Sequence, residues 1–437
     1  MSEKRVSKVL NSIKGFFTMK LPRFFKRTFK IIAQFFTVKV PKFFKDLPKN
    51  IVYFFKVKLP RFLESKAGRS FINSLVAIVI GLFIGFIVML VTKPANAFDG
   101  FGRLVTGGFA LGLQSFGTVL QDAAPLILTG LAFAFAAKTG LFNIGASGQF
   151  MVGGVAALYV ANLVNLPNII HFIVCVLAAV VAGGIWAAIA GILKALFNVS
   201  EVIATIMLNY IGMYLTVILV LNPKVYDGSI TAIRLFHPTA NTPGFGFSSM
   251  PNLDIAILIA LGIAIFISFI LNRTTLGYQL KAVGYSSEGS KYAGIPYKRN
   301  IVIAMFISGA LAGLGAALAY LPVKPVYMRP ITTLVPYGFD GMSVSLLASN
   351  SPIGIIFSGL FISYIKNGAK PMQFAGFDKE IGNIVISVII YVAALSSFIG
   401  MLIQRRKEQR ILKKSLENSE VNKWKNMMYS KVMLVDL

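Results

Sequence analysis

The stretch "TGLFNIGASGQF", residues 139–150, begins the longest uncharged run of the chain and decides how the rest is interpreted. That run, residues 139–193, has no Asp, Glu, Lys or Arg, and one membrane crossing takes only about 20 residues. We therefore expect two spans joined near "NLPN", residues 165–168. The run also opens with Asn143, Ser147, Gln149 and three glycines. This segment is either a polar loop or a broken helix beside a solute pathway.

The composition indicates an all-α integral membrane protein. Hydrophobic residues make up 56% of the 437 positions and charged residues only 14%. We expect about ten transmembrane crossings, one of them a half-helix near residues 334–348, where Pro336 and Asp340 interrupt the apolar pattern. The others are placed at 71–91, 118–138, 143–164, 168–193, 201–222, 253–272, 301–321, 352–368 and 381–403.

The placement of positive charge predicts the orientation. Of 43 Lys and Arg residues, eighteen lie in residues 1–69, nine follow Gln404, and five lie in the loop 273–300. Basic residues near span ends favour the cytoplasmic side, so both termini and the loop are predicted inside the cell membrane. Three parts follow: a cytoplasmic arm (1–69), a transmembrane domain (70–403) and a basic cytoplasmic tail (404–437).

The arm contains a repeat with a period of 19 residues. "FFTMKLPRFFK" at 16, "FFTVKVPKFFK" at 35 and "FFKVKLPRFLE" at 54 align Pro22, Pro41 and Pro60. We interpret the repeats as basic amphipathic segments lying on the anionic inner leaflet. A disordered basic tail is the main alternative, and nucleic-acid binding is disfavoured.

No catalytic or metal-binding pattern appears in the chain. A P-loop is excluded because the dipeptide Gly-Lys never occurs, and Cys175 stands alone. We therefore predict no enzyme activity, metal or cofactor. Three acidic residues lie next to or inside spans: Asp122 at an interface, Glu201 at a helix start, and Asp340 between Gly338 and Gly341, with Arg329 and Lys324 as possible partners. Asp340 is the one predicted in a pathway.

The basic loop "LGYQLKAVGYSSEGSKYAGIPYKRN", residues 276–300, contains a predicted short helix at 286–293. Leu280, Val283, Tyr292 and Ile295 give the loop an apolar side. A groove on a partner protein would explain that side.

Several motifs resemble one family. "LKAVGYSSEGSKYAGI" resembles the coupling loop of ABC-importer permeases of the ribose/branched-chain amino-acid type. "TGLFNIGASGQFMVGG", "SEVIATIMLNYIGMYL", "ISGALAGLGAAL" and "GFDGMSVSLLASNSPIGI" are more specifically similar to nucleoside-importer permeases associated with BMP-type lipoprotein receptors. The similarity runs in order from about residue 117 to 400 and leaves out the arm and the tail.

The resemblance implies the ABC-importer permease fold and a nucleoside substrate, with ATP used by a partner. It also implies separate cytoplasmic ATPase subunits, a second homologous permease and a surface lipoprotein receptor. The loop residues expected to couple to the ATPase are Gly284, Glu288, Gly289, Tyr292, Ala293, Gly294 and Ile295.

Polar and aromatic residues of the matching motifs could contact ribose hydroxyls and a base. The predicted pathway residues are Phe142, Asn143, Ser147, Gln149, Asn209, Tyr210 and Asp340. For the polar ones, an interhelical hydrogen bond that only holds the bundle together is an equal alternative. A simple-sugar permease of the same class is the nearest alternative function. A stand-alone secondary transporter or channel is disfavoured because intramembrane carboxylates are few.

Overall fold

A computed structural model describes residues 66–233, 237–322, 327–378, 380–392 and 395. Contacts divide the chain between Arg69 and Ser70, and the fold below is that of the second unit. Most of the predicted arm (1–69) and the whole predicted tail (404–437) lie outside the described residues.

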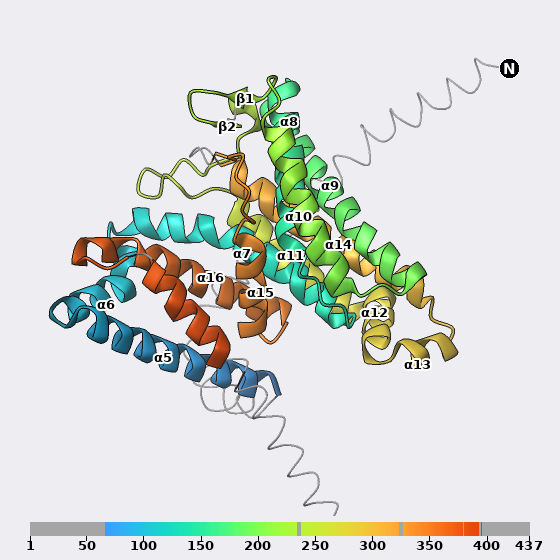
Figure 1. The fold of residues 1–437 in the computed structure, drawn as a ribbon, viewed down its shortest axis with the longest axis horizontal. Helices are drawn as coiled ribbons and strands as arrows, with labels where there is room; N and C mark the ends of the chain where they lie inside the picture. The colour runs from blue at the N-terminus through green and yellow to red at the C-terminus, as the bar shows by residue number, and fades with distance from the viewer. Residues whose placement is uncertain (1–65, 234–236, 323–326, 379, 393–394, 396–437) are drawn as a thin grey trace, which may run out of the picture. The chain divides into compact units, whose positions relative to one another are not determined.

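The described chain is almost entirely helical (Figure 1). Its helices are α5 (Lys66–Thr92), α6 (Ala97–Thr106), α7 (Leu113–Lys138), α8 (Ala146–Leu163), α9 (Asn168–Phe197), α10 (Glu201–Val220), α11 (Ala256–Arg273), α12 (Thr275–Tyr285), α13 (Ser287–Tyr292), α14 (Tyr297–Tyr320), α15 (Tyr337–Leu347), α16 (Pro352–Ala369) and an apolar helix Glu380–Val392. Short 3-10 turns cover Pro94–Asn96, Gly107–Phe109, Pro238–Ala240 and Pro371–Ala375. Strands β1 (Tyr226–Asp227) and β2 (Ala232–Ile233) pair antiparallel, with Tyr226 opposite Ile233.

These helices follow the predicted crossings in order. Seven of them, in the described part of the chain, are long and apolar enough to cross a membrane. The uncharged run 139–193 supplies both α8 and most of α9, as its length predicts. The expected half-helix is α15, which has only 11 residues.

The sequence predicts no helix at the position of α6. This helix has 10 residues and carries an ion pair between Asp99 and Arg103 at 3.0 Å, one turn apart. Its length and polarity are those of a short amphipathic helix, so a search for 20-residue apolar runs passes over it.

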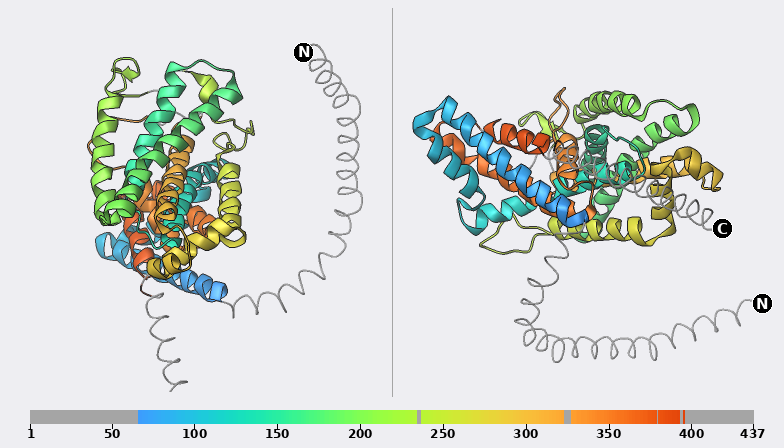
Figure 2. Two further views of the ribbon diagram at one scale, coloured as in Figure 1. Left: turned by 90° about the vertical axis from the view of Figure 1, so that its right-hand side faces the viewer. Right: turned by 90° about the horizontal axis from the view of Figure 1, so that it is seen from below.

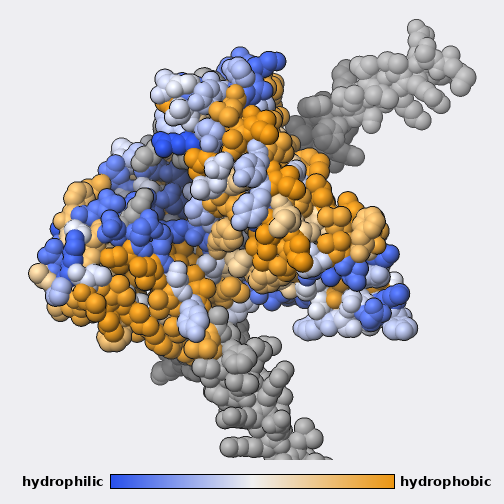
Figure 3. Space-filling view, in the orientation of Figure 1, coloured by the Kyte–Doolittle hydropathy of each residue, from blue (hydrophilic) through white to orange (hydrophobic). Residues whose placement is uncertain are grey.

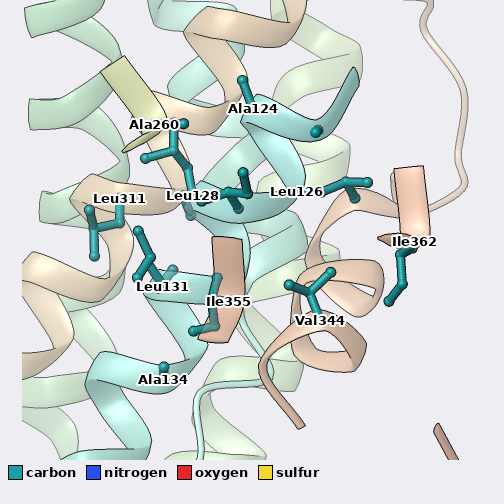
Figure 4. Close-up of a cluster of buried hydrophobic side chains, with 14 of the residues drawn as sticks. Ala124, Leu126, Leu128, Leu131, Ala134, Ala260, Leu311, Val344, Ile355 and Ile362 are labelled. Carbon is teal, nitrogen blue, oxygen red and sulfur yellow. The ribbon is translucent and has the colours of Figure 1, made fainter. Parts of the chain in front are cut away.

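Helix α7 is the centre of the fold. It packs against α14, α15, α16 and α11, and most of its side chains are buried on every face. A helix that is apolar all round belongs in a core rather than at a surface. Figure 4 shows part of this core, in which Leu128 and Leu131 of α7 lie among side chains such as Leu311, Val344 and Ile355 from three other helices.

Helices α8, α9 and α14 pack side by side (Figure 2). They approach one another at glycines. A Cβ atom at Gly153 would lie 2.6 Å from Cα of Gly313, and one at Gly309 would overlap the carbonyl oxygen of Gly183. The segment "SGALAGLGAAL" therefore brings backbones into contact, as small residues do between membrane helices.

The peripheral helices present apolar side chains outward. In α5, α9, α10 and α11, only a fifth to a third of the most apolar window is buried. Figure 3 shows hydrophobic surface over α5, α9 and α10, with hydrophilic surface at the β1–β2 end and around α12 and α13. An apolar belt between two polar ends suits a protein that crosses a bilayer.

Candidate functional site

The segment between α7 and α8 holds a closed hydrogen-bond network. Asn143 Nδ2 donates to Gln149 Oε1 at 3.0 Å and to Ser308 Oγ at 2.7 Å. Its Oδ1 accepts from Gln149 Nε2 at 3.0 Å and from the Gly145 amide at 2.9 Å. Ser308 in turn donates to the carbonyl of Ala132 in α7 at 2.6 Å. The two amides thus pair reciprocally and join this segment to α7, α8 and α14.

A second pair of polar residues ties the start of α8 to its neighbours. Ser147 Oγ donates to the carbonyl of Val335, just before α15, at 3.0 Å. Asn209 of α10 accepts from the amide of Gly148 at 2.8 Å and donates to the carbonyl of Ile144 at 2.9 Å. Side-chain amides therefore complete the backbone hydrogen bonds that this irregular segment cannot make by itself.

In this conformation the four predicted polar pathway residues bond to the protein. Asn143, Ser147, Gln149 and Asn209 are each no more than 2% exposed. Their geometry supports the interpretation that they hold the bundle together, and direct contact with a solute stays a prediction.

The two predicted aromatic residues lie differently. Phe142 is 41% exposed and packs edge-on against Phe133 of α7, with ring centroids 5.2 Å apart. Tyr210 shares the exposed face of α10 with Met207 and Tyr214. That face points away from the helix bundle, and Tyr210 is not brought together with the amide network.

Asp340 lies in the first turn of α15, as expected, but its partner differs from those predicted. It forms an ion pair with Lys366 of α16. Lys324 lies outside the described residues, and the ion pair is not made to Arg329. This pairing could not be predicted from the sequence, because it depends on α16 folding back along α15. Glu201 begins α10, as predicted, and bonds to Lys194 at 3.1 Å.

The predicted coupling loop folds as two capped helices. The Thr274 hydroxyl accepts from the Gly277 amide at 3.1 Å, and the Ser286 hydroxyl accepts from the Gly289 amide at 3.0 Å. These N-caps start α12 and α13. Gly294 ends the unit with a φ of 73°, which suits a residue without a side chain.

The surface of this loop is available to a partner, although less of it is apolar than predicted. Leu280 and Val283 are buried against this chain's own helices, so their apolar character needs no partner. Tyr292 is 91% exposed. The other predicted coupling residues are exposed or, for Ile295, half-buried: Gly284, Glu288, Gly289, Ala293 and Gly294.

The loop also touches the segment that opens the polar network. A Cβ at Gly284 would lie 2.7 Å from the carbonyl oxygen of Lys138 and 2.9 Å from the amide nitrogen of Gly140. Gly140 itself has a φ of 75°. The end of α12 therefore lies directly against the turn that leads to Asn143.

The sequence does not predict a buried carboxyl group that the structure contains. Asp254, two residues before α11, accepts from the Ala256 amide at 3.0 Å and from Gln121 Nε2 at 3.3 Å. Burial raises the pKa of Asp254 to about 6 despite these hydrogen bonds. In the sequence Asp254 is indistinguishable from a helix-capping residue at a surface.

Known proteins resemble this chain in sequence. Residues 115–394 match the family described as branched-chain amino acid transport system / permease component. The guanosine ABC transporter permease protein NupP of Bacillus subtilis is 36% identical over 337 residues, which cover 77% of this chain and 96% of that protein. The nucleoside ABC transporter permease protein NupB of Lactococcus lactis is 36% identical over 348 residues, or 78% and 94% of the two chains.

More distant relatives include sugar permeases. The D-allose transport system permease protein AlsC of Escherichia coli is 22% identical over 277 residues, covering 59% of this chain and 80% of that protein. No solved structure matches the chain.

The chain belongs to the branched-chain amino acid transport system permease family. It is a multi-pass membrane protein of the ABC transporter permease class.

Proposed function

We propose that this chain is the permease subunit of an ATP-driven nucleoside importer, in which it forms part of the translocation pathway. The observation that carries the proposal is its identity of 36% to a guanosine permease and to a nucleoside permease, over nearly their whole lengths. The sequence contains no P-loop, and the proposal therefore assigns ATP hydrolysis to a separate subunit. ATP is then the partner's substrate, and this chain needs no cofactor.

The α12–α13 unit docks on the cytoplasmic ATPase in this proposal. Its exposed face, with Tyr292 at 91% exposure, and its contact with Lys138 and Gly140 support a role in passing movement to α7 and α8. Gly289→Glu adds a charged side chain to that face and should leave assembly of the membrane part intact while uncoupling ATP hydrolysis from uptake. Gly228→Glu, in the exposed turn between β1 and β2 and outside the α12–α13 unit, is the matched control. Normal uptake with Gly289→Glu would contradict the docking proposal.

The complete importer would also contain a second, homologous permease and a surface lipoprotein receptor. In this arrangement both termini and α12–α13 are cytoplasmic. The distribution of basic residues supports that orientation, since residues 273–300 carry five of them. Cysteines introduced singly at Ser287 and at Gly246, in a variant with Cys175→Ala, test it with a membrane-impermeant thiol reagent. Labelling of Gly246→Cys alone in intact cells is expected, and labelling of Ser287→Cys alone would reverse the orientation.

The arm at 1–69 is proposed to bind the anionic inner leaflet. Its eighteen basic residues, interleaved with phenylalanines, supply both charge and apolar contact. Deleting residues 1–65 from the full complex should abolish any excess binding of added anionic vesicles over zwitterionic ones at physiological salt. Equal vesicle binding with and without the arm would refute this, and a loss of ATPase subunits on deletion would assign the arm to a protein partner.

Substrate class is tested by competition. Cells expressing the chain with its ATPase, second permease and receptor should take up radiolabelled guanosine, and unlabelled ribose in large excess should compete weakly. If ribose competes as strongly as adenosine, the simple-sugar alternative is favoured. That alternative is supported by the weaker similarity of this chain to a D-allose permease, at 22% identity.

A further inference from the structure

Four charged side chains meet where α7, α15 and α16 come together. Asp340 pairs with Lys366, and Asp122 lies 3.6 Å from the ammonium group of Lys370. Asn367 connects the second pair: its Nδ2 donates to Asp122 at 3.0 Å, and its Oδ1 accepts from Lys370 at 2.7 Å. The two carboxylates and the two ammonium groups balance each other in charge.

This cluster lies at the depth of the spanning helices, and its four side chains are partly exposed. Asp122 precedes Lys138, the last residue of α7, by sixteen positions, which is roughly 24 Å of helix. In the proposed orientation it is near the outer edge of the hydrocarbon core. The four side chains are between 19% and 62% exposed, and charged groups at that depth avoid lipid because their desolvation is costly. They therefore face water or protein.

Two tyrosines extend the cluster toward α8. Tyr337, at the start of α15, stacks on Phe150 with ring centroids 4.8 Å apart and planes inclined by 15°. Tyr320, at the end of α14, packs edge-on against the ring of Phe150, with ring centroids 5.8 Å apart. Tyr337 is close enough to Tyr320, Asp122 and Asp340 to interact with all three electrostatically.

The hydroxyl groups of these tyrosines are available to a ligand. Among the described residues neither hydroxyl has a hydrogen-bond partner within the protein, and neither is sealed from solvent. Tyr320 is nevertheless only 7% exposed, and its ring fits because Gly154 has no side chain: a Cβ there would lie 2.8 Å from the ring. A phenol buried to this degree is ordinarily hydrogen-bonded. The described residues supply no such partner, which leaves the Tyr320 hydroxyl as a candidate contact for a solute.

We propose that Tyr320, Tyr337, Asp122 and Asp340 form a contact site for the sugar hydroxyl groups of a nucleoside on its way through the pathway. Carboxylates accept hydrogen bonds from hydroxyl groups, and a phenol both donates and accepts them. Because the cluster is neutral overall, it suits an uncharged polyhydroxyl solute better than a nucleotide. The inference rests on the proposed function and names residues for it.

The test compares two solutes in the assembled importer. Tyr337→Phe and Tyr320→Phe keep both rings and remove only the hydroxyl groups. Tyr159→Phe is the matched control, because the Tyr159 hydroxyl already donates to the carbonyl of Leu219 at 2.7 Å. The maximal uptake rate is measured for guanosine and for 2′,3′-dideoxyguanosine, each relative to the unmodified complex, so that receptor preferences cancel.

Each cluster variant should lower guanosine uptake about fivefold and leave dideoxyguanosine uptake nearly unchanged, as expected for loss of one hydrogen bond. The control variant should not change the ratio of the two rates. Equal losses for both solutes, or no loss at all, would overturn the inference. No ATP-dependent guanosine uptake by the unmodified complex would instead refute the proposed function.

Discussion

Replacing Asn143 with alanine tests whether the amide network holds the fold together. The side chain makes four hydrogen bonds of 2.7 to 3.0 Å at a position with no solvent exposure. Each such bond contributes about 0.6 kcal/mol inside membrane proteins and about 1 kcal/mol in soluble ones. The variant should therefore lose about 2 to 4 kcal/mol of stability, and the apparent melting temperature should fall by roughly 2 to 4 °C.

The assay is heating of the detergent-solubilised, fluorescently tagged complex followed by size-exclusion chromatography. Asn272→Ala is the control, since Asn272 makes one exposed bond of 3.5 Å to Ser268. Gln149→Ala added to Asn143→Ala should cost less than it does alone, because its partner is already gone. Suppose instead that Asn143→Ala melts like the control while guanosine uptake collapses. The amide would then contact solute, and the structural interpretation would be wrong.

Three further predictions concern other parts of the chain. Gly284→Ala puts a Cβ atom 2.7 Å from the Lys138 carbonyl oxygen and so disturbs the contact between α12 and the turn after α7. ATPase activity should persist, while the amount of solute taken up per ATP hydrolysed should fall. An unchanged ratio of uptake to hydrolysis would show that this contact does not transmit movement. Gly313→Val would overlap the α9 backbone and should cost at least about 3 kcal/mol, seen as loss of folded protein, whereas Gly262→Ala, with nothing within 4 Å of its Cβ, should be harmless. Asp254→Asn should raise the melting temperature at pH 7.5 and have little effect at pH 3.5. Burial raises the pKa of Asp254 from its ordinary value of 3.8 to about 6, so the stability that comes from the protonated carboxyl is fully present below 3.8 and is lost as pH rises to about 6. A gain that is the same at both pH values would contradict this.

Local patterns in the sequence were sufficient for the order of the helices. The uncharged run after Lys138 is long enough for two spans, and Pro336 and Asp340 mark a segment too interrupted to cross fully. Both α8–α9 and the 11-residue α15 appear where those patterns predict them. Helix α6 was missed because an amphipathic helix of 10 residues has no distinctive signal beside 20-residue apolar runs.

Partners distant in the sequence could not be predicted. Asn143 bonds to Ser308, 165 positions away, and a serine within "ISGALAGLGAAL" looks like any other small packing residue. Asp340 pairs with Lys366 because α16 folds back on α15, which depends on tertiary packing. Leu280 and Val283 were predicted to need a partner, and the fold itself buries them. Residue types therefore indicated the chemistry of the site, while packing decided which groups meet.

The most direct test of the importer account uses the purified complex in liposomes, with receptor outside and ATP inside. Radiolabelled guanosine should accumulate above its outside concentration, and an ATPase subunit inactivated at its nucleotide site should abolish this accumulation. Uptake that persists unchanged with the inactive ATPase, and instead follows a proton or sodium gradient, would contradict the account and make this chain a stand-alone carrier.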